Sequence, residues 1–338
     1  MILRTETVEQ TIDSGRRGTF VKQVVMTPGQ PIGMVRKFRA GGGPTRGAVM
    51  LIHGFGQNRY TWHISQRSFS AFLAELGWDV FNVDLRGHGR SLIFDGKRPR
   101  ALDEYVEEDL PACAREVLHL SGHDKVFLVG HSMGGLVSYC AGATGLKGMV
   151  RGIVTLGSPY RFGKGSLAMR SLAAVINAGR ATGILDSPIQ LPLKLLGTHL
   201  RRRRSLWDSW LLPTPVRPWR PGSIEDDVLA EYLDLAFERT NLSIAFDILA
   251  GGDRVALRSG DGAIDYGVAF EALKSPLLVV AGDQDDLAPP ESCRVAYDRS
   301  GSSDKMFRVF PAGHVDIVIG RETAATIWPL IGDWLARR

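Results

Sequence analysis

Short runs of consecutive apolar residues alternate along the chain with segments whose apolar residues recur at helical spacing. Residues 48–52 and 276–281 are apolar runs and residues 150–156 are mainly apolar, which is typical of strands buried on both faces of a sheet. Residues 65–76 instead repeat large apolar side chains at helical spacing and stop at a glycine, which predicts a helix. The alternation of the two patterns predicts a mainly parallel sheet with right-handed crossovers and helices on both faces.

Residues 7–38 show a different pattern, in which turn residues separate short β-like runs. Turns are predicted at Ser14-Gly15, at Pro28-Gly29 and at Gly33, so we expect antiparallel edge strands that lead into the sheet. Residues 102–120 predict a helix with acidic residues early, in which Pro111 imposes a kink or a late start. The other predicted elements are strands at 78–85, 126–129 and 306–310 and helices at 291–297 and 323–335.

The alternation stops after residue 159. The segment that follows holds helical stretches such as 167–178 and 228–237, joined by proline-rich pieces, and we find no buried strand in it. The pattern therefore predicts an insertion. We expect an α/β core formed by residues 1–159 and 275–338, with residues 160–274 as a mainly helical cap between its two parts.

A Gly-x-Ser-x-Gly sequence at residues 130–134 follows an apolar run and precedes a helical pattern. A strand, a very tight turn and a helix would place Ser132 at the tip of the turn, where a base and a substrate carbonyl can both reach its hydroxyl. Gly130 and Gly134 leave room for the sharp turn, and the helix directs its N-terminal amides at developing negative charge. The sequence therefore indicates a nucleophilic serine, the alternative being a glycine-rich turn with an incidental serine.

A serine nucleophile needs a base and an acid that orients the base. Three aspartates follow the predicted strand 276–281, and His314 follows the predicted strand 306–310. Both loops fall at the same edge of the sheet as Ser132 and come later in the chain. His314 is therefore the candidate base, and three residues compete as the acid: Asp283, Asp285 and Asp286.

Five segments together resemble the α/β-hydrolase family of serine hydrolases. They span nearly the whole chain outside the predicted cap, and as a set they are far more specific than any one of them alone. The segments are His53-Gly54-Phe55-Gly56, Asp84-Leu85-Arg86-Gly87-His88-Gly89-Arg90-Ser91, Gly130-His131-Ser132-Met133-Gly134-Gly135, Gly282-Asp283-Gln284-Asp285-Asp286-Leu287-Ala288-Pro289 and Gly313-His314.

This resemblance implies a fold and a set of roles. The fold is the α/β-hydrolase fold, an α/β class with a mostly parallel central sheet, helices on both faces and a cap insertion. By the resemblance Ser132 attacks a carbonyl, His314 acts as general base and then acid, and Asp285 orients the imidazole. The backbone N–H groups of Phe55 and Met133 would form the oxyanion hole. Neither a cofactor nor a metal ion is expected.

The residue at the turn separates branches of this family. Dehalogenases and epoxide hydrolases that resemble this family carry aspartate at the position of Ser132, and polyester synthases carry cysteine there. Because this chain has serine, these branches are set aside. His53 and His131 are expected to brace the backbone, and His88 to pack within its turn. Ordinary surface or hydrogen-bonded roles are expected for His63, His119, His123 and His199.

Composition and charge are those of an ordinary globular protein and exclude only a few classes of function. Of the 338 residues 44% are hydrophobic and 23% charged, which is ordinary for a globular protein, and the net charge of +5 is no nucleic-acid signature. Cys113, Cys140 and Cys293 are widely spaced, so neither a disulfide framework nor a zinc site is indicated. No secretory signal and no apolar run of about 20 residues is found. We expect a cytoplasmic protein that does not bind nucleic acid.

The predicted cap is rich in leucine, tryptophan and arginine. Its apolar residues would line a pocket for an acyl chain, or would pack the cap on the core. The run Arg201-Arg202-Arg203-Arg204 is most simply a solvated face. The sharper hypothesis is that this run draws the cap to an anionic lipid surface or to an anionic substrate.

The function that we expect is a carboxylic ester hydrolase, of esterase or lipase type, whose partner is a small-molecule ester with a hydrophobic acyl group. The enzyme would form an acyl intermediate on Ser132. The same triad would serve an amidase, a thioesterase, a C–C bond hydrolase or an acyltransferase, because function depends on the pocket. A non-catalytic ligand-binding receptor of the same fold is the alternative from a different class.

Overall fold

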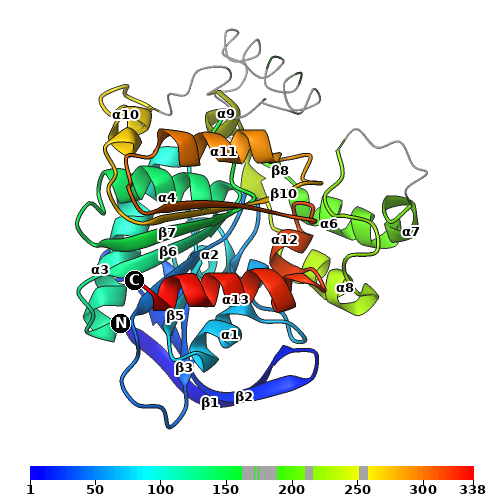
Figure 1. Cartoon of the computed structure of the whole chain (residues 1–338), viewed down its shortest axis with the longest axis horizontal. Helices are drawn as coiled ribbons and strands as arrows, with labels where there is room; N and C mark the ends of the chain where they lie inside the picture. The colour runs from blue at the N-terminus through cyan, green and yellow to red at the C-terminus, as the bar shows by residue number, and fades with distance from the viewer. Residues whose placement is uncertain (162–170, 172–173, 175–188, 210–215, 251–257) are drawn as a thin grey trace.

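The computed structural model describes residues 1–161, 171, 174, 189–209, 216–250 and 258–338. Its described part is built around a nine-stranded sheet with the strand order β1-β2-β3-β5-β4-β6-β7-β10-β11 (Figure 1). The strands are β1 (Ile2–Asp13), β2 (Arg16–Met26), β3 (Gly33–Arg39), β4 (Ala48–Ile52), β5 (Asp79–Asp84), β6 (Val126–His131), β7 (Val150–Leu156), β10 (Leu277–Gly282) and β11 (Lys305–Phe310).

The sheet has an antiparallel part and a parallel part. β1, β2, β3 and β5 pair antiparallel, and each pairing from β5 through β4, β6, β7 and β10 to β11 is parallel. β6 lies between β4 and β7, with Leu128 paired to Met50 on one side and to Ile153 on the other. The predicted antiparallel edge and mainly parallel sheet are confirmed, and the carboxyl ends of the parallel strands meet at one edge.

Helices cover both faces of the sheet (Figure 1). Among the described residues, no helix is both long and apolar enough to cross a membrane. Outside the insertion the helices are η1 (Arg59–Thr61), α1 (Phe69–Glu75), α2 (Gly89–Asp95), the π-helix η2 (Glu104–Asp109), α3 (Leu110–Ser121), α4 (Met133–Ala143), α11 (Pro290–Arg299), α12 (Asp316–Ile319) and α13 (Thr323–Ala336).

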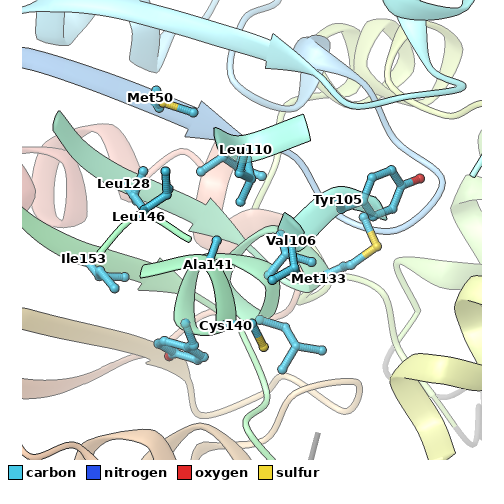
Figure 2. Packing of buried hydrophobic residues seen from close by; sticks show 14 of the residues in the cluster. Met50, Tyr105, Val106, Leu110, Leu128, Met133, Cys140, Ala141, Leu146 and Ile153 are labelled. Atoms are coloured by element: carbon cyan, nitrogen blue, oxygen red, sulfur yellow. The ribbon is translucent and has the colours of Figure 1, made fainter. Parts of the chain in front are cut away.

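Alternate residues of the central strands face the two helical layers. Phe127 and Val129 belong to the buried cluster that contains residues of α1 and α13. Leu128, between them in the chain, belongs to the cluster that contains residues of α3 and α4. Figure 2 shows this second cluster, in which Met50 and Leu128 of the sheet lie with residues of α3 and α4. The apolar runs of the sequence are continuous because both faces of each central strand are buried.

One of two predicted helices begins later than expected. α1 starts at Phe69 rather than at residue 65, because the side chain of Ser68 accepts a hydrogen bond from the N–H of Ala71 and caps the helix there. The helix predicted at 102–120 begins at residue 102, as predicted, and continues through the π-helix η2 into α3, with Pro111 at the start of α3.

The segment around Gly33 was predicted wrongly. Gly33 is the first residue of β3 rather than part of a turn. A Cβ on Gly33 would lie 2.6 Å from the Cβ of Arg90, so the glycine allows α2 to pack on β3. α2 itself was not predicted, because its sequence, which includes Gly89, carries no clear helical repeat. The glycine therefore serves close packing between elements, which a local pattern does not reveal.

The described part of the insertion is mainly helical. The predicted helix 228–237 is α8, whereas the predicted helix 167–178 lies almost wholly outside the described residues. One correction is needed, because β8 and β9 form a short antiparallel pair and β9 is buried. The division of the chain into core and cap stays a prediction. The elements are β8 (Gln190–Leu191), α6 (Leu193–Arg202), α7 (Arg204–Trp207), α8 (Asp226–Leu235), β9 (Thr240–Asn241), α9 (Leu242–Ala250) and α10 (Tyr266–Glu271).

One lysine is buried in the antiparallel part of the sheet. Lys37 of β3 is 1% exposed. Its ammonium group donates hydrogen bonds to Gln10 and, over 3.3 Å, to the hydroxyl of Ser70, and it lies above the ring of Phe20. Burial lowers the pKa of Lys37 to about 7, because desolvation penalises the charged form.

This burial predicts a pH-dependent stability. The unfolded chain keeps the proton of Lys37 up to its ordinary pKa of about 10.4, whereas the folded chain loses it near the lowered value. Between these values the unfolded state binds more protons, so the free energy of unfolding rises with pH, by at most about 1.4 kcal/mol per pH unit. Lys37→Met should remove this rise, as measured by urea unfolding at several pH values.

The control is Lys97→Met, because the Lys97 side chain is exposed. This variant should keep the pH dependence of the wild type. If the unfolding free energies of Lys37→Met and the wild type run parallel over the whole interval, Lys37 does not have a lowered pKa in the folded protein.

Candidate active site

Ser132 stands between the last residue of β6 and the first residue of α4. Its backbone has φ +53° and ψ −122°, a strained conformation for a residue with a side chain. A Cβ on Gly130 would collide with the backbone of Gly134, and a Cβ on Gly134 would collide with the carbonyl oxygen of Ile52. The two glycines are therefore required by the tight turn, as the sequence predicted.

Three predicted site residues from distant parts of the chain form a hydrogen-bonded row. The Nε2 atom of His314 lies 3.0 Å from the hydroxyl oxygen of Ser132. The Nδ1 atom of the same ring lies 2.8 Å from the Oδ2 atom of Asp285. Both residues are buried, Asp285 with 2% and His314 with 8% of its surface exposed. With Nδ1 donating to the carboxylate, Nε2 is left to accept the proton of the serine hydroxyl.

The structure distinguishes the three competing aspartates. Asp285 uses Oδ1 to accept hydrogen bonds from the N–H groups of Leu287 and Ala288, at 2.9 and 2.7 Å, which aims Oδ2 at the imidazole. Asp286 accepts from the N–H of Arg217, over 2.8 Å, and Asp283 is exposed. Asp285 is therefore the only one of the three that contacts His314.

A glycine leaves room for this carboxylate and imidazole. Gly157, just after β7, has φ +52°, a conformation that favours glycine. A Cβ at this position would lie 2.9 Å from Oδ2 of Asp285 and 3.4 Å from Nδ1 of His314. The end of β7 can therefore pass beside the hydrogen bond between the two side chains.

The two predicted oxyanion donors lie in loops next to Ser132. Met133 is the first residue of α4, and the first N–H groups of a helix have no partner within the helix. Phe55 follows Gly54, where an added Cβ would lie 3.2 Å from the Cβ of Ser132. Both N–H groups thus belong to segments adjacent to the nucleophile. Their role as oxyanion donors stays a prediction.

Sequence reasoning missed Gln57, which connects the loop of residues 53–56, called the glycine loop below, to the insertion by hydrogen bonds. Its side-chain oxygen accepts hydrogen bonds from the N–H of Gly54, at 3.2 Å, and from the hydroxyl of Thr61, at 3.1 Å. Its side-chain nitrogen donates to the hydroxyl of Tyr232 on α8, over 2.8 Å. The only sequence signal was its place directly after the glycine loop. Gln57 therefore fixes the peptide that precedes Phe55.

The buried histidines brace the backbone, as predicted. His53 donates from Nδ1 to the carbonyl oxygen of Gly54 and accepts at Nε2 from the N–H of Leu85. His131 donates from Nε2 to the carbonyl oxygen of His314, over 2.9 Å. Burial lowers the pKa of His53 to about 4 and that of His88 to about 3, so both rings are neutral at pH 7.

The Asp84–Ser91 segment has a structural role. The carboxylate of Asp84 accepts hydrogen bonds from the backbone and side chain of Arg59, both at 2.8 Å, and from the N–H of Arg90, at 2.9 Å. A Cβ on Gly89 would collide with this carboxylate. The segment thus holds η1 and α2 beside the sheet edge that carries the site.

The arrangement can perform nucleophilic chemistry with the side chains of the row alone. An oriented base next to a hydroxyl activates it for attack on a carbonyl carbon. Among the described residues no group of three or more His, Cys, Asp or Glu side chains is placed to hold a metal ion. The three cysteines are free, buried thiols.

The geometry makes a prediction about the reactivity of Ser132. Labelling of the serine by a fluorophosphonate should slow by on the order of 10⁴ in Asp285→Asn, because the amide does not hold the imidazole in the required tautomer. The measurement is the rate of adduct formation by mass spectrometry of the intact protein. Asp286→Asn and Asp283→Asn are the controls and should label at nearly the wild-type rate. A loss in Asp286→Asn as large as in Asp285→Asn would contradict this assignment.

Known proteins share this architecture. The chain is 29% identical to a monoacylglycerol lipase of Mycolicibacterium smegmatis over 281 residues, which cover 79% of this chain and 80% of the relative. It is 23% identical to a poly(3-hydroxyalkanoate) polymerase subunit of Haloferax mediterranei, over 80% of this chain and 55% of that protein. The solved structure of a monoacylglycerol lipase of Paleococcus ferrophilus has a TM-score of 0.60 at 22% identity, over 90% of this chain and 98% of that one.

The family model of the alpha/beta hydrolase fold matches residues 47–320. This match covers most of the chain, including β4, the turn at Ser132 and the loops that carry Asp285 and His314. The chain therefore belongs to the α/β-hydrolase fold family.

Proposed function

We propose that this protein hydrolyses carboxylic esters through an acyl-enzyme on Ser132. The observation that carries the proposal is the row of hydrogen bonds from Ser132 through His314 to Asp285, at 3.0 and 2.8 Å. The similarity to a monoacylglycerol lipase over most of both chains supports the same reaction class. We also propose, from the apolar residues beside the site, that the acyl group is hydrophobic.

In the first half of the reaction the serine oxygen attacks the ester carbonyl while Nε2 of His314 takes its proton. The negative charge that forms on the carbonyl oxygen is stabilised by the N–H groups of Phe55 and Met133. Collapse of this intermediate breaks the ester C–O bond, and the leaving alcohol takes the proton from His314. Asp285 stabilises the imidazolium in between.

In the second half water replaces the alcohol. It gives a proton to His314 and attacks the acyl carbon, and collapse releases the carboxylic acid as Ser132 regains its proton from the imidazole. The two halves predict ping-pong kinetics, with an acyl-enzyme between them. The same triad also suits amides, thioesters, C–C bonds and acyl transfer, and these are the alternatives if esters are not hydrolysed.

Apolar side chains of the insertion support the hydrophobic acyl group. Leu193 of α6 packs so closely on Gly56 that a Cβ there would collide with it. Phe55 itself is partly buried and packs against the hydrophobic cluster on one face of the sheet. The loop that carries one predicted oxyanion donor is thus bordered by apolar side chains. Such a border favours an acyl chain and excludes water.

The test is hydrolysis of p-nitrophenyl esters of increasing acyl length by the wild type and by Ser132→Ala. Loss of the nucleophile should lower kcat by on the order of 10⁶, as in other serine triads. The control is Ser303→Ala, an exposed serine, which should keep wild-type kcat and KM.

The acyl length with the highest kcat/KM gives the length of the acyl chain that the pocket accommodates. If the wild type and Ser132→Ala are equally slow on every ester, the ester proposal fails. The amides, thioesters and diketones are then assayed with the same pair of proteins.

A further inference from the structure

Helices α6 and α7 have one side packed on the protein and another side open to solvent. Gly197 and Leu200 are the buried residues of α6. A Cβ on Gly197 would lie 2.6 Å from the carbonyl oxygen of Leu233 on α8, so the two helices are in close contact. No residue of α7 is buried. This pair of helices therefore presents a large outward surface.

Large apolar side chains lie on this outward surface. Leu195 and Leu196 of α6 are 66% and 44% exposed, and Leu206 of α7 is 45% exposed. Single exposed apolar residues are common, but three within two consecutive short helices form a local group that is costly to leave in water.

The same surface is basic. Residues 189–207 contain five lysines and arginines and no acidic residue. Arg201 is paired with Asp234, and Arg204 is held by Asp208, Asp226 and the carbonyl oxygen of Ile224. In the part of the chain that the structure describes, Lys194, Arg202 and Arg203 are exposed and form no ion pair. The arginine run thus divides into two structural and two available cations.

This surface adjoins the active site. Leu193, the first residue of α6, packs on Gly56, the neighbour of Phe55. Figure 1 shows α6, α7 and α8 together on the side of the molecule away from both chain ends. A binding partner that contacts α6 is therefore close to the loop that carries Phe55, a predicted oxyanion donor.

We infer that this outward surface, called the docking surface below, binds to the surface of a membrane that contains anionic lipids. It consists of Lys194, Leu195, Leu196, Arg202, Arg203 and Leu206. The leucines would enter the boundary between head groups and acyl chains, and the cations would lie at the level of the lipid phosphates. Docking would bring the mouth of the site to the bilayer, from which a lipophilic ester could enter. This last step rests on the proposed function.

A membrane fits the docking surface better than an acidic protein does. Unpaired cations alone would suit any polyanion, and exposed leucines alone would suit any apolar groove. A bilayer with anionic lipids offers both a layer of negative charge and an apolar layer just below it, along the full length of two helices. The docking surface has cations for the first layer and leucines for the second.

The experiment is co-sedimentation of the full chain with vesicles of phosphatidylcholine alone or of phosphatidylcholine mixed with phosphatidylglycerol. The wild type should bind the anionic vesicles more tightly. The variant with Lys194→Ser, Arg202→Ser and Arg203→Ser should lose roughly 100-fold in affinity for them, since each cation near an anionic surface contributes about fivefold. Leu195→Ser with Leu196→Ser should lose about tenfold for both kinds of vesicle.

A charge-matched control separates docking from the net positive charge. Arg4→Ser, Arg17→Ser and Lys97→Ser remove three exposed cations elsewhere and should leave vesicle binding unchanged. An equal loss in this control would overturn the inference, as would equal binding of the wild type to both kinds of vesicle. Full competition by soluble polyglutamate would also overturn it in favour of an acidic protein.

Failure of docking can be told apart from failure of the proposed function. Hydrolysis of a water-soluble p-nitrophenyl ester needs no membrane, and the docking surface contains no residue of the triad. All vesicle-binding variants should therefore keep wild-type kcat on the soluble ester. A variant that loses vesicle binding and keeps this activity supports the inference, and a wild type that binds vesicles without ester hydrolysis refutes only the function.

Discussion

The site depends on one backbone constraint, the positive φ of Ser132 at the junction of β6 and α4. A non-glycine residue in such a conformation costs on the order of 1 to 3 kcal/mol, so the surroundings must hold it. They do so because β4, β6 and α4 are in backbone contact at Gly130 and Gly134 and because the N–H of Ser132 donates to the carbonyl oxygen of Leu156. The constraint projects the serine hydroxyl toward His314, which follows β11, the third strand along the sheet from β6, at the same edge.

The sequence predicted those features that depend on strand order and on local turn geometry. Ser132 and His314 could be found because apolar runs mark buried strands, and the carboxyl ends of parallel strands meet at one edge. Asp285 could be separated from its two neighbours only by resemblance, because the choice depends on which carboxylate accepts the N–H groups of Leu287 and Ala288. Residue type alone carries no such information. Gln57 and Lys37 were missed for the same reason, since their importance comes from partners far away in the chain.

The described part of the insertion is attached to the glycine loop of the core through polar contacts. Besides the bond from Gln57 to Tyr232, the side chain of Asn58 donates to the carbonyl oxygen of Leu235, and the N–H of Glu238 donates to that of Gly56. These contacts surround the peptide that includes Phe55. The end of α8 and the predicted oxyanion loop therefore form one hydrogen-bonded unit. Helix α6 packs against both parts of that unit, through Leu193 on Gly56 and through Gly197 on α8. Its opposite side carries the docking surface, so the inferred membrane contact lies close to the site.

The central claim is that Ser132 carries the acyl group during turnover. The most direct measurement is acid quench of the enzyme within the first turnovers of an activated ester, followed by peptide mapping with mass spectrometry. The account predicts a burst of product and an acyl adduct on the peptide that contains Ser132, with no adduct in Ser132→Ala. Steady turnover with an adduct on another residue, or with unchanged adduct formation in Ser132→Ala, would contradict it.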